Sequence, residues 1–162
     1  MTRALVLAAA LALLAGAAQA QNAGQIARAQ AGQSCAGCNL FQADLSYKNL
    51  SGRSFAGARL RQSDLSLATL DRANLSRTDL AFANAYGARL SGANLAGADL
   101  TNATLVGAYL GGANLSGARM AGANLSGADL STTRGLSARQ LAGACGDGET
   151  RLPRGINVVA CR

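Results

Sequence analysis

Four cysteines are the residues of this sequence with the most evident chemistry, because the chain contains no histidine. Cys35 and Cys38 form a Cys-x-x-Cys motif, whereas Cys145 and Cys161 lie near the other end of the chain. A Cys-x-x-Cys motif can be a redox dithiol, half of a zinc site or a structural disulfide. Covalent haem attachment requires a histidine after the second cysteine, so Asn39 excludes it.

The acidic residues give little support for catalysis. Histidine, the commonest general base, is absent, and there is no G-x-S-x-G nucleophile motif. Asp147 and Glu149 alternate with glycines, which is the pattern of a turn. A calcium loop would need more oxygen ligands at fixed spacing. We therefore expect a protein that is not an enzyme and that binds no cofactor or metal ion.

The N-terminal segment has the layout of a secretory signal peptide. Arg3 gives a basic start, residues 4–16 are an apolar run, and Ala18-Gln19-Ala20 has the form of a cleavage site. The alternative is an uncleaved membrane anchor, but the apolar run is short for a span of about 20 residues. We expect a signal peptide over residues 1–20, export to a bacterial periplasm or the medium, and no membrane span after cleavage.

A five-residue period runs through the middle of the chain. Between residues 40 and 130, leucine occupies 16 of the 19 positions that are five residues apart. Alanine is common two residues earlier, Asn or Asp one residue earlier, and glycine two residues later. This period fits neither an α-helix nor a plain strand. A chain that turns a corner every five residues closes a coil in about 20, and stacked coils lie ~4.8 Å apart.

The A-[ND]-L-x-x pattern over about residues 38–132 resembles the pentapeptide-repeat family. The segment that ends at Leu152-Pro153 is similar to the G-D-x-x-T-x-L-P tail that often follows the repeats in this family. The resemblance implies an all-β solenoid, a right-handed quadrilateral β-helix, here of about five coils over residues 33–132. Some members mimic DNA and protect DNA gyrase. That role requires an acidic cytoplasmic rod, whereas this chain has a net charge of +7 and an export signal.

The segments on either side of the repeats are expected to differ from them. We expect residues 21–32 to form a flexible N-terminal segment and residues 133–162 to form a cap. Ser137 and Gln140 have the spacing of a capping box, which predicts a short helix over about 138–143. Leu136 and Leu141 would then pack against the last coil.

The predicted rod places the two pairs of cysteines at opposite ends. This placement favours disulfides Cys35–Cys38 and Cys145–Cys161 and excludes a four-cysteine zinc site within one chain. The second bridge would close a 17-residue loop, worth about 3 kcal/mol of stability. A redox role for Cys35–Cys38 is the less favoured alternative, because Cys38 enters a repeat directly rather than a helix N-terminus.

Two departures from the repeat are informative. Ala85 replaces a leucine between Phe82 and Tyr86, which indicates either local repacking or a shallow ligand notch. Lys48 and Arg53 occupy positions where alanine would point inward. Since a buried unpaired charge is costly, we expect an irregular first corner from which both side chains reach outward.

The outward positions offer columns of side chains for binding. The column Ser54, Asn74, Asn94 and Asn114 is either a binding face or a hydrogen-bonded ladder that serves stability alone. The candidate binding surface consists of arginines in the second and third coils: Arg59, Arg61, Arg72, Arg77 and Arg89.

These features predict a structural or protein-binding module with a protein as partner and no nucleic acid. The alternative is a binder of an anionic cell-envelope polymer through Arg59, Arg61 and the basic tail. A thiol-redox module at Cys35–Cys38 is the third hypothesis.

Overall fold

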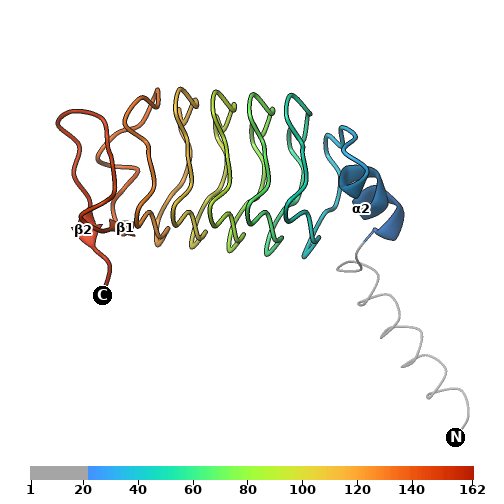
Figure 1. Ribbon diagram of the computed structural model, residues 1–162, viewed down its shortest axis with the longest axis horizontal. Helices are drawn as coiled ribbons and strands as arrows, with labels where there is room; N and C mark the ends of the chain where they lie inside the picture. Colours follow the sequence, from blue (N-terminus) through green and yellow to red (C-terminus); the bar gives the residue numbers. More distant parts are fainter. Residues whose placement is uncertain (1–21) are drawn as a thin grey trace, which may run out of the picture.

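A computed structural model describes residues 22–162 of the chain. These residues wind into a right-handed quadrilateral β-helix with one short helix, α2 (Ala23–Gln30), against its N-terminal end (Figure 1). Strands β1 (Cys145–Gly146) and β2 (Val159–Ala160) lie at the C-terminal end. The solenoid prediction is confirmed, whereas the predicted signal peptide lies outside the described residues. Within residues 22–162 no helix has the length and apolar character needed to cross a membrane.

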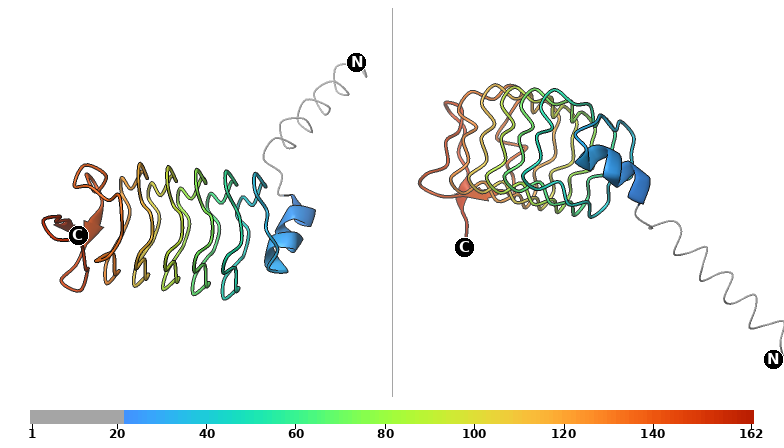
Figure 2. Two further views of the ribbon diagram at one scale, coloured as in Figure 1. Left: turned by 90° about the horizontal axis from the view of Figure 1, so that it is seen from above. Right: turned by 45° about the vertical axis from the view of Figure 1, so that its right-hand side comes forward.

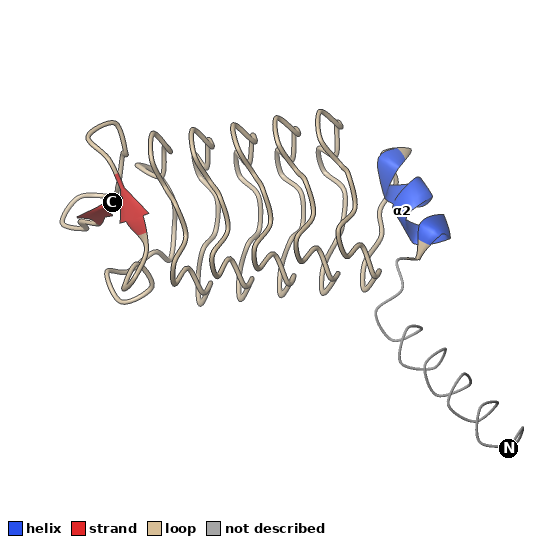
Figure 3. Cartoon of the chain, turned by 90° about the horizontal axis from the view of Figure 1, so that it is seen from below, coloured by secondary structure: helices blue, strands red, loops and turns tan. Residues whose placement is uncertain are grey.

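Successive coils pair in parallel with a register of 20 residues. Bridges of this register run from Asn39↔Arg59 to Asn114↔Arg134. Each face contributes one bridging residue per coil, so the coils are drawn as loops although their backbones are paired (Figure 3). Figure 2 shows the stacked coils from two further sides. Since residues 20 apart stack and each coil has four faces, residues 10 apart lie on opposite faces. We name the four faces, in chain order, after the core leucines Leu60, Leu65, Leu70 and Leu75.

The corners are β-turns closed by a hydrogen bond from the alanine position to the preceding leucine carbonyl. At one corner, Ala43 N–H donates to the Leu40 carbonyl oxygen at 3.0 Å, and Gln42 has a φ of 55°. A positive φ at this third residue is the signature of a type II turn and favours glycine. Eight corners nevertheless carry a side chain there: Gln42, Tyr47, Gln62, Leu67, Arg72, Arg77, Phe82 and Asn102.

The interior is filled by the leucines and alanines of the repeat, which are buried along the whole rod. Ala85 is buried as well, and its N–H donates to the Thr104 carbonyl oxygen at 2.8 Å, as in the other coils. The coil is therefore regular at this substitution.

The irregular first corner that we expected at Lys48 and Arg53 is wrong. Their carbonyl oxygens accept the usual inter-coil bonds from Thr69 and Asn74, at 2.9 and 2.8 Å. Both residues are exposed, so the expectation that their side chains reach outward is confirmed. Both lie in the first turns of the rod, where long side chains can leave without displacing the backbone.

The expected flexible segment before the repeats is also wrong, because it contains helix α2. Asn22 caps this helix by accepting the Gln25 N–H at 3.1 Å. The Gln25 side-chain oxygen accepts the Asn39 N–H at 2.6 Å, and the Gln30 amide donates to the Asp44 carbonyl oxygen at 2.9 Å. The two glutamine amides thus take the place of backbone partners that a preceding coil would supply.

The coils continue beyond the last regular repeat. Bridges Asn124↔Cys145 and Asp129↔Arg151 show that an irregular sixth coil follows, although its pairs are 21 and 22 residues apart. The helix predicted over 138–143 is absent, and these residues form consecutive turns instead. Among the predicted contacts, Gln140 accepts the Ser137 N–H at 2.9 Å and Leu141 is buried.

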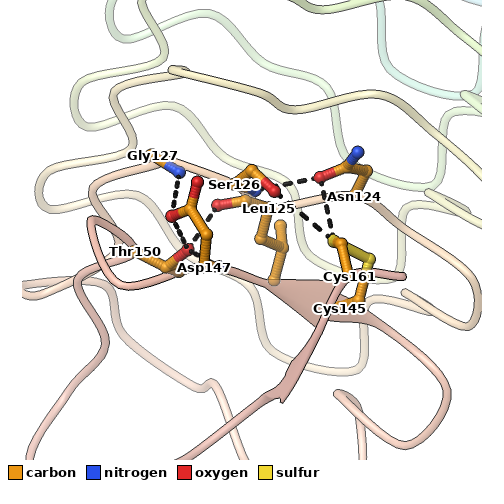
Figure 4. Close-up of a disulfide and its surroundings, with 8 residues drawn as sticks. All are labelled: Asn124, Leu125, Ser126, Gly127, Cys145, Asp147, Thr150 and Cys161. Atoms are coloured by element: carbon orange, nitrogen blue, oxygen red, sulfur yellow. Dashed lines mark hydrogen bonds between the residues drawn. A yellow bond between two sulfur atoms is a disulfide. The ribbon is translucent and has the colours of Figure 1, made fainter.

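Side chains complete the hydrogen bonds of this sixth coil. The Gln140 amide donates to the carbonyl oxygens of Leu115 and Ala118, at 2.7 and 3.1 Å. Asp147 Oδ1 accepts the Gly127 N–H at 2.8 Å, and Thr150 Oγ1 donates to the Leu125 carbonyl oxygen at 3.0 Å (Figure 4). The inserted residues are therefore accommodated without orphaned backbone groups at these positions.

Replacement of Gln140 should destabilise the C-terminal end of the rod. Gln140→Ala leaves the Ala118 carbonyl oxygen without its donor and removes one of the two donors to the Leu115 carbonyl oxygen, which keeps the Ala118 N–H. It should lower the free energy of unfolding by about 1–3 kcal/mol. Gln140→Glu should be at least as damaging, because a carboxylate would face the same oxygens. Urea unfolding measures both effects. Gln33→Ala is the control, since the exposed Gln33 side chain makes no hydrogen bond to a described residue, and an equal loss there would contradict the assignment.

Acid should weaken the same end through Asp147. The hydrogen bond from the Gly127 N–H is the main cause that holds the pKa of Asp147 below its ordinary value. A depressed folded-state pKa contributes stability above the unfolded pKa of about 3.9, and this contribution is lost as the pH falls through the folded value. Asp147→Asn should therefore lower the urea midpoint at pH 7. At pH 2–3 the midpoints of the variant and the wild type should lie closer together. Glu149→Gln is the neighbouring control; a difference that stays constant with pH would refute the linkage.

Candidate functional site

Both predicted disulfides are present, Cys35–Cys38 and Cys145–Cys161. Cys35 and Cys38 are buried, and the Gln25 carbonyl oxygen of α2 lies 3.7 Å from the Cys35 sulfur. Because an exchanging thiol must reach a disulfide sulfur, this burial disfavours the redox hypothesis. Across residues 22–162, no three His, Cys, Asp or Glu side chains are grouped as metal ligands would be.

The five candidate arginines do not form one surface. Arg59 and Arg61 lie on the Leu60 face, whereas Arg89 lies on the opposite Leu70 face. Arg72 stands at the corner between the Leu70 and Leu75 faces, and Arg77 at the next corner, before the Leu60 face of the following coil. The structure therefore divides them. Arg59 and Arg61 share one face, Arg72 and Arg89 line one depression on the opposite side, and Arg77 stands at a corner of its own.

The arginines of the Leu60 face are held by aromatic rings. The Arg59 guanidinium lies 4.8 Å from the centroid of Phe41, and that of Arg61 lies 5.0 Å from the centroid of Phe82. Arg61 is also 3.6 Å from Asp79. Neither ring contact was expected from the sequence, although a 20-residue register brings these partners close together.

Large apolar side chains gather on the Leu65 face and its two corners. Tyr47, Leu67, Phe82 and Tyr86, which we call the aromatic face, are 75, 45, 47 and 52% exposed. Tyr47 and Leu67 share one corner column, and Leu67 lies along the backbone of Gly87, the next residue of that column. The sequence pointed to Phe82 and Tyr86 beside Ala85, but not to the other two residues.

The corners of this region carry backbone strain. Five consecutive corners from Gln62 to Phe82 hold non-glycine residues at positive φ, whereas every corner from Gly107 to Gly127 holds glycine. A left-handed conformation costs an ordinary residue about 1–2 kcal/mol. Such strain clusters where a side chain has a function beyond folding. Leu67, Arg72 and Phe82 share this conformation with Gln62 and Arg77, so it marks functional candidates only together with their exposure and contacts.

An open depression of about 560 Å³ marks the Leu70 face. It is lined by Ser51, Gly52, Asp71, Arg72, Arg89 and Ser91. Arg89 and Asp71 form an ion pair of 2.7 Å, and Asp71 Oδ1 also accepts the Ser91 N–H at 3.0 Å. The depression is thus polar and internally ordered, unlike the aromatic face.

The asparagine column of the Leu75 face is a hydrogen-bonded ladder. Asn94 Nδ2 donates to Asn74 Oδ1 at 3.5 Å, and Asn114 Nδ2 donates to Asn94 Oδ1 at 3.4 Å. Each oxygen also accepts the backbone N–H two residues further on. The predicted hydrogen-bonded ladder is therefore present from Asn74 to Asn114 and ties these coils together.

Comparison with known proteins identifies relatives. A model of pentapeptide repeats, in eight copies, matches residues 34–72, 54–92 and 93–131. HetL from the cyanobacterium Nostoc sp. strain PCC 7120, a pentapeptide repeat protein involved in heterocyst differentiation regulation, is 33% identical over 75% of this chain, with a TM-score of 0.43. The match covers 56% of HetL, so the chain spans little more than half of that relative.

Two further solved structures are similar. A second pentapeptide repeat protein of Nostoc PCC 7120 is 31% identical over 78% of this chain and 96% of its own, with a TM-score of 0.48. A pentapeptide repeat protein from the Arabidopsis thaliana thylakoid lumen is 32% identical over 68% and 73%, with a TM-score of 0.32. Among curated proteins, no match is found. Because the repeat model covers more than half of the chain, the protein belongs to the pentapeptide-repeat family.

Proposed function

We propose that this protein is an exported, non-enzymatic module that binds a partner protein through the aromatic face. The observation that carries the proposal is the exposure of Tyr47, Leu67, Phe82 and Tyr86 on one side of the rod. The chain has only six Phe and Tyr residues, and three of them contribute to this face. Exposed apolar side chains that gather on one side of a folded protein mark interaction surfaces.

The composition of the surface favours a protein partner. Tyrosine, phenylalanine and arginine are enriched in protein interfaces, and Arg61 lies against Phe82 at the edge of this face. The backbone beneath is fixed by the inter-coil hydrogen bonds, so little ordering is required on binding.

Export is part of the proposal. The basic start, apolar run and A-x-A site of residues 1–20 support it. The disulfides Cys35–Cys38 and Cys145–Cys161 are compatible with it, because such bonds persist in oxidising compartments.

Removal of the aromatic face should abolish capture of the partner. Tyr47→Gly with Tyr86→Ser introduces residues that already stand in the same columns, at Gly107 and Ser66. We expect in-cell crosslinking to a discrete protein to fall at least about tenfold, because two hot-spot side chains are lost. Capture by the wild type should persist in high salt.

The matched control is Tyr109→Thr, which places the Thr69 residue type at an exposed tyrosine of the Leu70 face. It should leave capture unchanged. Equal losses in both variants, or undiminished capture by the double variant, would rule out the aromatic face as the binding surface.

A second candidate function is binding of an anionic envelope polymer through Arg59, Arg61 and the basic tail. The observation that favours it is the pair of guanidiniums held on Phe41 and Phe82. This hypothesis predicts that retention on lipopolysaccharide vesicles is lost in ~0.5 M salt, where the screening length is only a few Å. Arg59→Ala with Arg61→Ala should weaken retention severalfold, whereas salt-resistant retention or an unaffected double variant would exclude it.

A further inference from the structure

The depression on the Leu70 face combines groups that the protein-binding proposal does not use. Its floor is the column Ser51, Asp71 and Ser91, which stack in three successive coils. Glycine at 52 leaves the first coil open at the corner where Arg72 stands one coil later. The result is a polar hollow of about 560 Å³, a size typical of small-ligand sites.

The two arginines of the hollow differ in their engagement. Arg89 is neutralised by Asp71 at 2.7 Å, whereas Arg72 has no ion pair with any residue from 22 to 162. The Arg72 side chain runs along the backbone of Gly92, since an added Cβ there would lie 3.6 Å from Arg72 Cγ. Its guanidinium is thus a free planar donor, the group best suited to a bidentate carboxylate.

The remaining groups suit hydroxyls and an apolar ring face. Asp71 presents acceptor oxygens, and the hydroxyls of Ser51 and Ser91 line the same hollow. Gly111 stands one coil beyond Ser91, and the Tyr109 ring lies over it. A Cβ added to Gly111 would lie within 3.0 Å of three atoms at the end of the Tyr109 side chain. Tyr109 is exposed and lies on the same face as the hollow. An exposed tyrosine offers an apolar ring with a polar tip.

We propose that this hollow binds a carboxylated sugar unit of an acidic polysaccharide. The sugar carboxylate would take the Arg72 guanidinium, and its hydroxyls would take Asp71 and the two serines. The C–H face of the sugar would lie on Tyr109. The carboxylate of Asp71 within the site disfavours more densely charged polyanions such as polyphosphate. This site lies on a different face from Tyr86 and is independent of the protein-binding proposal.

Binding of galacturonate oligosaccharides to the full disulfide-bonded chain tests the assignment by calorimetry or NMR titration. Arg72→Gly should weaken binding at least tenfold, and Tyr109→Thr should weaken it severalfold. Arg77→Gly is the matched control, because Arg77 has the same backbone conformation as Arg72 and its replacement removes the same charge. It should change affinity less than twofold. Glycine is the residue found in both columns, at Gly92 and Gly97, so both variants should fold.

The outcomes separate recognition from simple attraction. Saturable binding that neutral galactose oligosaccharides and polyphosphate do not reproduce would support a carboxylated-sugar site. Equal losses in Arg72→Gly and Arg77→Gly, equal binding of polyphosphate, or no binding of galacturonate by the folded wild type would each overturn it. Capture of the protein partner should be unaffected by Arg72→Gly, so this test can fail while the proposed function stands.

Discussion

The inter-coil backbone hydrogen bond is the interaction on which the structure depends. Each coil must supply N–H and C=O groups in register with the next, and four five-residue faces meet this requirement with 20 residues in each regular coil. A thin core of leucine and alanine then suffices, because the backbone polar groups are satisfied by neighbouring coils. The ends are where the requirement is hardest to meet, and there Gln25, Gln30 and Gln140 offer side-chain amides in place of a missing peptide group.

The regular part of the fold was predictable, because few backbone arrangements place every fifth residue in a core. The structures of the two caps were not predictable in the same way. The disulfides followed from the placement of the cysteines at opposite ends of a rod. Helix α2 has no periodic signal, and its docking depends on two glutamines whose partners cannot be read from sequence. The S-x-x-Q spacing over 137–140 favoured a helix locally. There the chain must instead bring Cys145 into register with Asn124, and tertiary pairing overrides the local preference.

The candidate sites were predictable in part, for a related reason. The 20-residue register, which the period implies, places Tyr47 beneath Leu67 and separates Arg59 from Arg89. Applied to the arginines, it would have divided the surface that composition alone suggested. The hollow at Arg72 depends on side-chain directions and on an ion pair between Asp71 and Arg89, which are 18 residues apart. The 20-residue register brings this pair close together, as it does Phe41 and Arg59, but it does not give the direction of the Arg72 side chain.

The strained corners connect stability with function in this rod. From Gly107 to Gly127 every corner is glycine, which shows that the fold itself accepts the unstrained solution. The five consecutive corners from Gln62 to Phe82 carry larger side chains in place of glycine. This stretch supplies Leu67 and Phe82 to the aromatic face and Arg72 to the hollow. Each such corner costs about 1–2 kcal/mol of stability relative to glycine. The strain therefore supports the two proposals only together with the exposure of Leu67 and Phe82 and the place of Arg72 in the hollow, because Gln62 and Arg77 adopt the same conformation outside both surfaces.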